Sequence, residues 1–308
     1  MPPPRNPKLF NGMEELQVRT GDVAKALAAP GTKIVRQTYT TPVETHNPIE
    51  PAATVAVWDA PDRLTIYNAT QWVKGEQAII AQAFRLPPEN VRVICPFVGG
   101  GFGCKGSSWP HTLLAVMAAR LVGRPVKLPL TRAEMFTCLG HRAQTVQHIT
   151  LGASEDGQLQ AVRHATESVT SHAGEFIEPC GLGTTKVLYA SPSVEVEHTR
   201  YKTNVATPTY MRAPGESPGT FALESAMDEL AVTLGIDPIE LRLRNHADVT
   251  PVANRPFSHK NLKECYRIGA EKFGWSRRIP APRSMRDGNL LVGWGMATAT
   301  YPAYRFVG

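Results

Sequence analysis

The chain has 308 residues, of which 42% are hydrophobic and 19% are charged, and its formal net charge is +6. A chain of this length and composition can bury one large or two medium cores, which excludes disorder over its whole length. The 33 lysines and arginines occur singly or in pairs. No basic run marks a nucleic-acid interface, so we expect no nucleic-acid partner.

The five cysteines are widely spaced and form no CxxC pair. They are Cys95, Cys104, Cys138, Cys180 and Cys265. We therefore expect no iron–sulfur cluster or structural zinc on this chain, and a reducing, cytoplasmic compartment. The first ten residues are rich in proline and contain no apolar core segment. This predicts neither a signal peptide nor a membrane span, with export to the periplasm through a partner subunit's signal as the alternative.

The first half of the chain predicts a strand, a glycine-rich loop and a helix in succession. Patterns indicate, in order, a short helical stretch at 21–29, strands at 54–58 and 64–67, a helix at 73–86, a strand at 91–95 and a helix at 111–121. Strand, glycine loop, helix is an order that proteins use to bind phosphate-bearing cofactors.

The second half of the chain predicts long β segments followed by helices. Patterns indicate β segments at 144–171, with a turn at Asp156-Gly157, and at 185–203, helices at 217–234, 238–245 and 260–273, and a further strand within 290–308. Asp237 followed by Pro238 is typical of a helix start. We expect the β segments to pair antiparallel, and the whole to be an α+β fold of mixed sheets with packed helices.

The strongest local motif is the sequence VGGGFGCKG at residues 98–106. Glycines let backbone N–H groups approach a ligand closely, although a glycine-rich turn on its own is more often a tight loop. Phe102 has no turn-forming purpose, so we expect its ring to face a ligand. The loop lacks both the GK[ST] ending of a P-loop and the acidic residue of a Rossmann site, which argues against a generic nucleotide site.

A second motif is YMRAPGE at residues 210–216, just before a long helical pattern. Arg212 offers a planar set of donors suited to a carbonyl or carboxylate, but an arginine that only extends from a loop into solvent is an equal alternative. The segment HNPIEP at 46–51 and the pair Thr70-Gln71 are weaker when taken alone.

Taken together and in order, these segments match one family. They are HNPIEP at 46–51, ATQ at 69–71, VRV at 91–93 leading into GGGFGCK, TRAEM at 131–135, RAPG at 212–215, ESAMDELA at 224–231, GIDPIELR at 235–242, and Asn245. The chain thus resembles the molybdenum-binding large subunit of the xanthine dehydrogenase and aldehyde oxidase family from about residue 33 to 308. Its loop at 99–111 looks most like the bacterial aldehyde oxidoreductases.

The resemblance implies roles for individual residues. Gln71 would approach the apical oxo group of the metal, Phe102 would lie above the substrate, and Arg212 would orient it. The residues expected to contact the cofactor are Gln71, Gly100, Gly101, Phe102, Gly103, Arg212 and Ala213. No side chain of this chain is expected to ligate the metal.

The chemistry implied is hydroxylation of an aldehyde or aromatic heterocycle with water as the oxygen source. The cofactor would be molybdenum–molybdopterin in its cytosine dinucleotide form, and electrons would leave through iron–sulfur clusters and FAD on partner subunits. Gly106 stands where purine-oxidising members often carry a glutamate, which favours an aldehyde substrate. The family's glutamate base lies in a second cofactor-binding domain.

The resemblance also predicts a domain organisation that is incomplete at both ends. Residues 1–40 would be the remnant of a connection from an N-terminal domain, 41–280 the first molybdopterin-binding domain, and 281–308 the start of the second. The isolated chain would then be inactive. The alternative is a non-catalytic fragment or split-gene assembly module that only binds cofactor or partner subunits.

Overall fold

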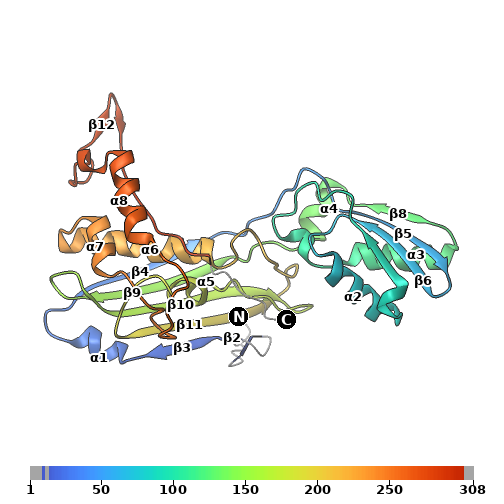
Figure 1. Ribbon diagram of the computed structural model, residues 1–308, viewed down its shortest axis with the longest axis horizontal. Coiled ribbons are helices and arrows are strands. Elements are labelled where there is room, and N and C mark those ends of the chain that lie inside the picture. The colour runs from blue at the N-terminus through green and yellow to red at the C-terminus, as the bar shows by residue number, and fades with distance from the viewer. Residues whose placement is uncertain (1–8, 11–13, 302–308) are drawn as a thin grey trace.

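The computed structural model describes residues 9–10 and 14–301 and has two lobes side by side, each built on its own sheet (Figure 1). Two short strands precede the elements of both lobes in the chain. They are β1 (Leu9–Phe10) and β2 (Glu14–Glu15), which pair with each other. This mixture of sheets and packed helices confirms the predicted α+β class. None of the helices in the described part is long and apolar enough to cross a membrane.

The larger lobe contains a five-stranded sheet in the order β3-β11-β10-β9-β4. Its strands are β3 (Gln17–Thr20), β4 (Lys33–Thr41), β9 (Thr145–Ala153), β10 (Leu159–Ser171) and β11 (Val194–Thr203). The expected antiparallel pairing holds for β9 with β10, but the expectation is wrong for β10 with β11, which are parallel. The reason is the long connection of residues 172–193, which returns the chain to the starting end of the sheet.

The expected boundary near residue 40 does not correspond to a break in this lobe. β3 pairs with β11, β4 pairs along its whole length with β9, and α1 (Val23–Ala28) packs against β10. Residues 17–41 are therefore part of the five-stranded lobe.

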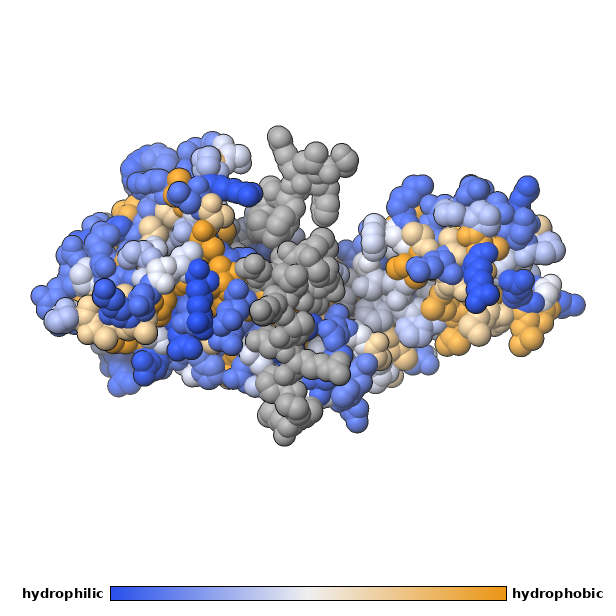
Figure 2. Space-filling model, turned by 90° about the horizontal axis from the view of Figure 1, so that it is seen from below, coloured by the Kyte–Doolittle hydropathy of each residue, from blue (hydrophilic) through white to orange (hydrophobic). Residues whose placement is uncertain are grey.

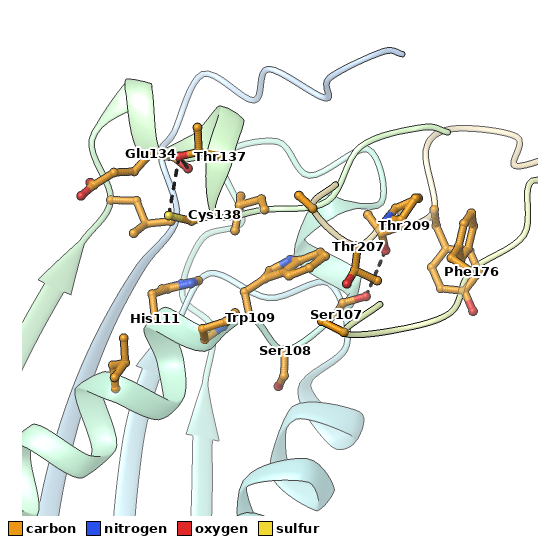
Figure 3. A pocket seen from close by; sticks show the side chains of 18 of the residues that line it. Ser107, Ser108, Trp109, His111, Glu134, Thr137, Cys138, Phe176, Thr207 and Thr209 are labelled. Carbon is orange, nitrogen blue, oxygen red and sulfur yellow. Dashed lines mark hydrogen bonds between the residues drawn. The ribbon is translucent and has the colours of Figure 1, made fainter. Parts of the chain in front are cut away.

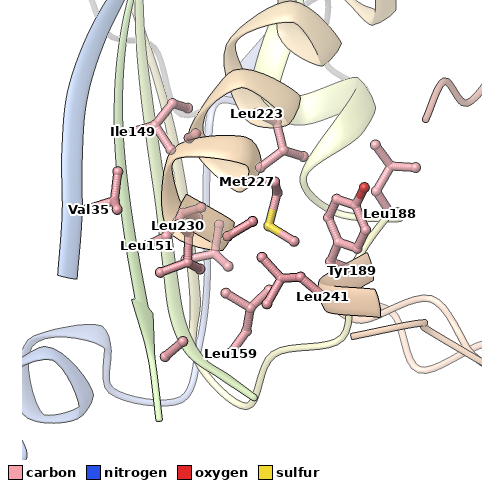
Figure 4. Close-up of a cluster of buried hydrophobic side chains, with 14 of the residues drawn as sticks. Val35, Ile149, Leu151, Leu159, Leu188, Tyr189, Leu223, Met227, Leu230 and Leu241 are labelled. Carbon is pink, nitrogen blue, oxygen red and sulfur yellow. The ribbon is translucent and has the colours of Figure 1, made fainter. Parts of the chain in front are cut away.

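Helix α6 (Glu216–Leu234) lies across the face of this sheet and contributes more buried residues to its core than any other element (Figure 4). Met227 and Leu230 of α6 pack against Ile149 and Leu151 of β9, and all four are buried. The helix is flanked by α5 (Cys180–Thr184) and α7 (Pro238–Arg244), and α8 (Leu262–Phe273) follows. The core thus fixes where α6 begins, which matters because the RAPG motif precedes that helix directly.

The smaller lobe contains a four-stranded sheet in the order β7-β6-β5-β8. Its elements are β5 (Ala53–Ala60), β6 (Arg63–Asn68), α2 (Val73–Phe84), β7 (Val91–Ile94), α3 (Pro110–Val122), β8 (Val126–Pro129) and, after it, α4 (Arg132–Thr137). Helices α2 and α3 bury Ile80 and Val116 against Ala56 and Ile66 of the sheet. Short 3₁₀ turns occur at Pro88–Asn90, Cys104–Gly106 and Trp275–Arg277.

The C-terminal part contains little of the strand expected within 290–308. β13 (Leu290–Leu291) pairs with β12 (Arg286–Asp287), and residues 292–301 form no strand. Residues 302–308 lie outside the described part of the chain. Leu290 and Leu291 are exposed, whereas Thr298 is buried and its hydroxyl bonds those of Tyr266 and Tyr189.

Two histidines inside the five-stranded lobe make its stability sensitive to acid. His164 bonds Thr185 (2.7 Å) and Gln147 (3.0 Å), and His198 bonds Ser168 (2.8 Å). Complete burial lowers the pKa of each ring to about 3. Between pH 6.5 and pH 3 the unfolded chain therefore binds more protons than the folded chain. The contribution of these neutral histidines to the free energy of unfolding is complete above pH 6.5 and is lost as the pH falls towards 3.

We expect the free energy of unfolding, measured in urea, to fall by about 2 kcal/mol per histidine between pH 7.5 and pH 5. A His164→Gln variant should lose about 2 kcal/mol of the total pH difference, because this ring no longer titrates while the other buried histidines still do. An equal pH difference in the variant and the unmodified chain would contradict the assignment.

Candidate functional site

The glycine-rich loop between β7 and α3 has a backbone that favours glycine at nearly every step. Gly99, Gly100 and Gly103 have φ values of 60°, 90° and 112°, and Phe102 itself has φ 55°. A non-glycine residue in this region carries strain that persists only where the surroundings fix it. The loop is therefore a specifically held conformation, and the sequence motif reflects backbone geometry as well as access for a ligand.

Lys105 holds the base of this loop. Its ammonium group bonds the carboxylate of Glu50 at 2.9 Å, the carbonyl oxygen of Glu50 at 3.0 Å and that of Val98 at 2.6 Å. Only 1% of the lysine side chain is exposed. This contact gives the HNPIEP segment a structural role. Its Glu50 connects the glycine-rich loop to the part of the chain that enters the four-stranded lobe.

Gln71 packs directly against the loop. Its backbone N–H donates to the carbonyl of Lys105 (2.7 Å), and its side-chain oxygen accepts from the N–H of Gly103 (2.9 Å). A Cβ on Gly101 would lie 2.3 Å from that same side-chain oxygen, so a side chain at position 101 would displace the amide of Gln71. Because the amide oxygen is already used, the NH₂ group of Gln71 remains as a donor for a ligand.

The RAPG turn approaches the loop from the other lobe. The N–H of Arg212 donates to the carbonyl of Phe102 (3.0 Å), and a Cβ on Gly103 would lie only 2.1 Å from the carbonyl oxygen of Tyr210. Ala213 has φ 56° and Gly215 has φ 81°. Two strained turns from different lobes thus meet backbone to backbone.

One open pocket of about 570 Å³ lies where these turns meet. Its lining residues are Gln71, Phe102, Gly103, Tyr210, Met211, Arg212, Ala213, Pro214 and Tyr301. The structure therefore brings together Gln71, Phe102 and Arg212, which are far apart in the sequence. Gly100 and Gly101 belong to the same loop but do not line the pocket: Gly101 faces Gln71, and Gly100 lies beside Pro48.

The pocket also has supporting residues that the sequence did not single out. His46 bonds the carbonyl of Tyr210 at 2.6 Å, and Arg142 bonds that of Arg212 at 2.7 Å. Burial lowers the pKa of His46, so its neutral ring donates to the carbonyl through Nε2. His46 lies in a motif that was too weak alone, whereas Arg142 stands in no recognisable pattern.

The carboxylates of the nearby motifs are engaged elsewhere, and none lines the pocket among the described residues. Glu50 pairs with Lys105, and Glu224 is buried with Arg242 at 2.8 Å. The site as described supplies hydrogen-bond donors and a cation, but no general base.

Several backbone donors of the loop are available to a ligand. Within the described residues, no hydrogen bond uses the N–H groups of Gly100, Gly101 or Phe102. Arg212 is exposed. Successive backbone N–H groups in a turn where right- and left-handed residues alternate form concavities that bind anions. The donor set therefore fits a phosphate- and carbonyl-rich cofactor such as a molybdopterin.

A larger cavity of about 970 Å³ shares Tyr210 with this pocket as a lining residue. Figure 3 shows this cavity from close by. Trp109, His111, Cys138 and Phe176 are among its lining residues. Burial lowers the pKa of His111 to about 4, so its ring is neutral at pH 7. The ring of Tyr210 packs edge-on against Phe176, with centroids 5.1 Å apart, and Tyr210 lines both pockets.

Comparisons with known proteins identify the family of this chain. Residues 5–246 match the model of the molybdopterin cofactor-binding domain. The chain is 40% identical over 278 residues to the aldehyde oxidoreductase molybdenum-binding subunit PaoC of Escherichia coli K12, and 32% identical over 298 residues to the xanthine dehydrogenase molybdenum-binding subunit of Escherichia coli O157:H7. These alignments cover 90% and 94% of this chain, but only 37% and 39% of the relatives.

Solved structures show the same fold. The aldehyde oxidoreductase of Desulfovibrio desulfuricans matches 85% of this chain and 30% of its own with a TM-score of 0.78 at 22% identity. Quinoline 2-oxidoreductase of Pseudomonas putida matches 84% of this chain and 35% of its own with a TM-score of 0.77 at 23% identity. With the family model covering most of the chain and both lobes meeting at the matched motifs, this protein belongs to the molybdopterin cofactor-binding domain family of the xanthine dehydrogenase and aldehyde oxidase type.

Proposed function

We propose that this chain forms part of the molybdenum site of a multi-subunit oxidoreductase that oxidises aldehydes. The observation that carries the proposal is the single pocket lined by Gln71, Phe102 and Arg212. Bacterial relatives of this chain are named as molybdenum-binding subunits of aldehyde oxidoreductase and xanthine dehydrogenase, which does not favour a non-catalytic assembly module. The chain spans a little over a third of the length of those relatives, 37% and 39%.

The groups that the pocket residues offer to a ligand suggest a role for each residue. The loop of Gly100, Gly101, Phe102 and Gly103 would hold the molybdopterin with Ala213 opposite, and the NH₂ group of Gln71 would donate to an oxo group on the metal. When bound, the cofactor would supply the redox and metal chemistry of the oxidation. Phe102, 47% exposed, offers a ring face to a planar substrate, and Arg212 offers its guanidinium to a carbonyl.

The substrate class is inferred from position 106. A Cβ at Gly106 would meet no atom within 4 Å, and the glycine itself offers no carboxylate. A purine would lack a carboxylate contact there, and an aldehyde or a less polar heterocycle needs none. We therefore propose aldehydes, with aromatic heterocycles as the second class.

Electron transfer and assembly need other subunits in this proposal. The cofactor would be the cytosine dinucleotide form, and an iron–sulfur subunit and an FAD subunit would carry the electrons in the cytoplasm. Exposed apolar side chains support docking: Leu114, Met117 and Leu121 follow one another along α3 with 54%, 56% and 88% exposure. Figure 2 shows apolar side chains gathered on the four-stranded lobe. Surfaces of this kind mark protein interfaces.

The proposal is tested by coexpressing the chain with the remaining subunits and assaying an aromatic aldehyde with an artificial electron acceptor. We expect turnover by the complex and none by the isolated chain, because the pocket residues described supply no carboxylate base and such assistance is worth roughly 10²- to 10⁴-fold. Turnover by the isolated chain would contradict the second part. A complex that contains molybdenum but oxidises no aldehyde would contradict the first.

A further inference from the structure

Arg142 lies where three chain segments meet between the lobes. The chain enters the four-stranded lobe after β4 and returns before β9, and the two crossings pair backbone to backbone at Glu44 and Arg142, with N···O distances of 2.9 and 3.4 Å. The third segment is the RAPG turn. Arg142 is only 3% exposed, although it carries a charge. Its side chain therefore belongs to the interior of the junction.

The guanidinium of Arg142 is occupied by carbonyls of the turn and by two carboxylates. It donates to the carbonyl oxygens of Met211 (3.2 Å) and Arg212 (2.7 Å), and more weakly to that of Ala213 (3.5 Å). It pairs with Glu178 at 2.9 Å and with Glu44 at 3.0 Å. A flat group with donors on several edges can hold diverging acceptors, which a lysine ammonium cannot do with the same geometry.

Glu178 completes the arrangement from the other side of the turn. Its side chain is fully buried, and the same oxygen that binds Arg142 also accepts the N–H of Gly215. A Cβ on Gly215 would lie 2.6 Å from Pro179, so the turn packs closely against the neighbour of Glu178. The pair thus binds both ends of the turn, and it accounts for the left-handed Ala213 between them, because strain persists only where contacts fix it.

Arg212 itself has no comparable anchor. Its guanidinium forms no ion pair with the part of the chain that the structure describes, and it stays exposed at the pocket. Its backbone is held from two directions, by Phe102 through its N–H and by Arg142 through its carbonyl. The direction in which this side chain leaves the turn is therefore set by the contacts of Arg142 and Glu178.

We propose that Arg142 and Glu178 are positioning residues of the pocket: they fix the backbone of residues 211–215 so that Arg212 faces Phe102. This inference rests on the proposed function only for the consequence in catalysis. Neither residue lines the pocket, and both act through the turn. A displacement of about 1 Å in a substrate-orienting group can lower a rate about 10²-fold, so loosening the turn should be visible in turnover.

The test uses Arg142→Lys in the coexpressed complex, which keeps the charge beside Glu178 but removes the forked donors. Arg242→Lys is the matched control, because Arg242 is equally buried, pairs with Glu224 at 2.8 Å and binds carbonyls of α6 and α7 that lie outside the pocket. At equal molybdenum content, we expect kcat/KM for an aldehyde to fall about 10- to 100-fold in Arg142→Lys and to stay within about twofold in Arg242→Lys. An unchanged kcat/KM in Arg142→Lys, or an equal fall in both variants, would overturn the proposal.

A second measurement does not depend on activity. Hydrogen–deuterium exchange of the amides of Arg212 and Gly215, which donate to the carbonyl of Phe102 and to Glu178, should become faster in Arg142→Lys and in Glu178→Gln, but not in Arg242→Lys. If the unmodified complex oxidises no aldehyde, the proposed function fails while this exchange experiment still decides the positioning role. Exchange at these amides as slow as in the unmodified chain would contradict it.

Discussion

Replacement of Gly103 with alanine is expected to remove the cofactor from the complex and to lower aldehyde turnover by at least about 10²-fold. At φ 112° an alanine is strained, and its Cβ would lie 2.1 Å from the carbonyl oxygen of Tyr210. The loop and the RAPG turn must then separate, which breaks the contact between Phe102 and Arg212 that closes the pocket. Molybdenum and pterin content, measured per chain after copurification, check this expectation.

Gly106→Ala is the matched control for this substitution. It adds the same methyl group three residues away, where no atom lies within 4 Å and φ is not in the left-handed region. It should retain the cofactor and the thermal stability of the unmodified chain. Equal cofactor content in the Gly103→Ala and Gly106→Ala variants would show that the close approach of loop and turn does not form the binding site.

The second large effect concerns stability. Arg242→Met should lower the free energy of unfolding by about 3–5 kcal/mol, because it leaves the carboxylate of Glu224 buried without its partner. The arginine side chain is fully buried, that of Glu224 is 4% exposed, and Arg242 also pairs with Asp228 at 2.8 Å. Urea denaturation at pH 7.5 measures the change.

Arg244→Met is its control on the same helix. Arg244 pairs with Glu240 one turn away and also donates to the carbonyl of Asp156, and the two side chains of the pair are 35% and 48% exposed. An exposed pair of this spacing contributes about 0.3–0.5 kcal/mol and a hydrogen bond about 0.5–1.5 kcal/mol, so this loss should stay well below that of Arg242→Met. A loss below about 1 kcal/mol for Arg242→Met would show that the buried pair of Arg242 and Glu224 does not stabilise the contact between α6 and α7.

The sequence predicted the helices whose start is set by residues close to them in the chain. α6 and α7 were expected at 217–234 and 238–245 and begin at Glu216 and Pro238, and the side chain of Asp237 caps α7 by accepting from Ile239 and Glu240. The Asp156-Gly157 turn joins two antiparallel strands as expected. These features depend on neighbouring residues, so the sequence alone contains the information.

The features that the sequence missed depend on contacts between distant segments. The parallel pairing of β10 with β11 is set by the path of residues 172–193, and the strand β4 is recognisable only through its partner β9. Arg142 acquires its role only when two crossings and a turn meet. The start of a second cofactor-binding domain at residue 281 stays a prediction.

The candidate site was found because its residues carry family motifs, and the structure adds the reason for each glycine. Gly101 leaves room for Gln71, and Gly103 leaves room for Tyr210. The sequence could not show which donors remain free. That follows from the hydrogen bond between Gln71 and Gly103, which uses the amide oxygen and leaves the NH₂ group.

The central claim is that molybdopterin binds between the loop of residues 100–103 and the turn of residues 211–214. The most direct test compares amide hydrogen exchange in the complex purified from cells that make molybdopterin and from cells that cannot. The account predicts slower exchange with cofactor at Gln71, at residues 100–103 and at residues 211–213. Unchanged exchange at these amides, with protection instead at Ser107–His111 around the larger cavity, would contradict it.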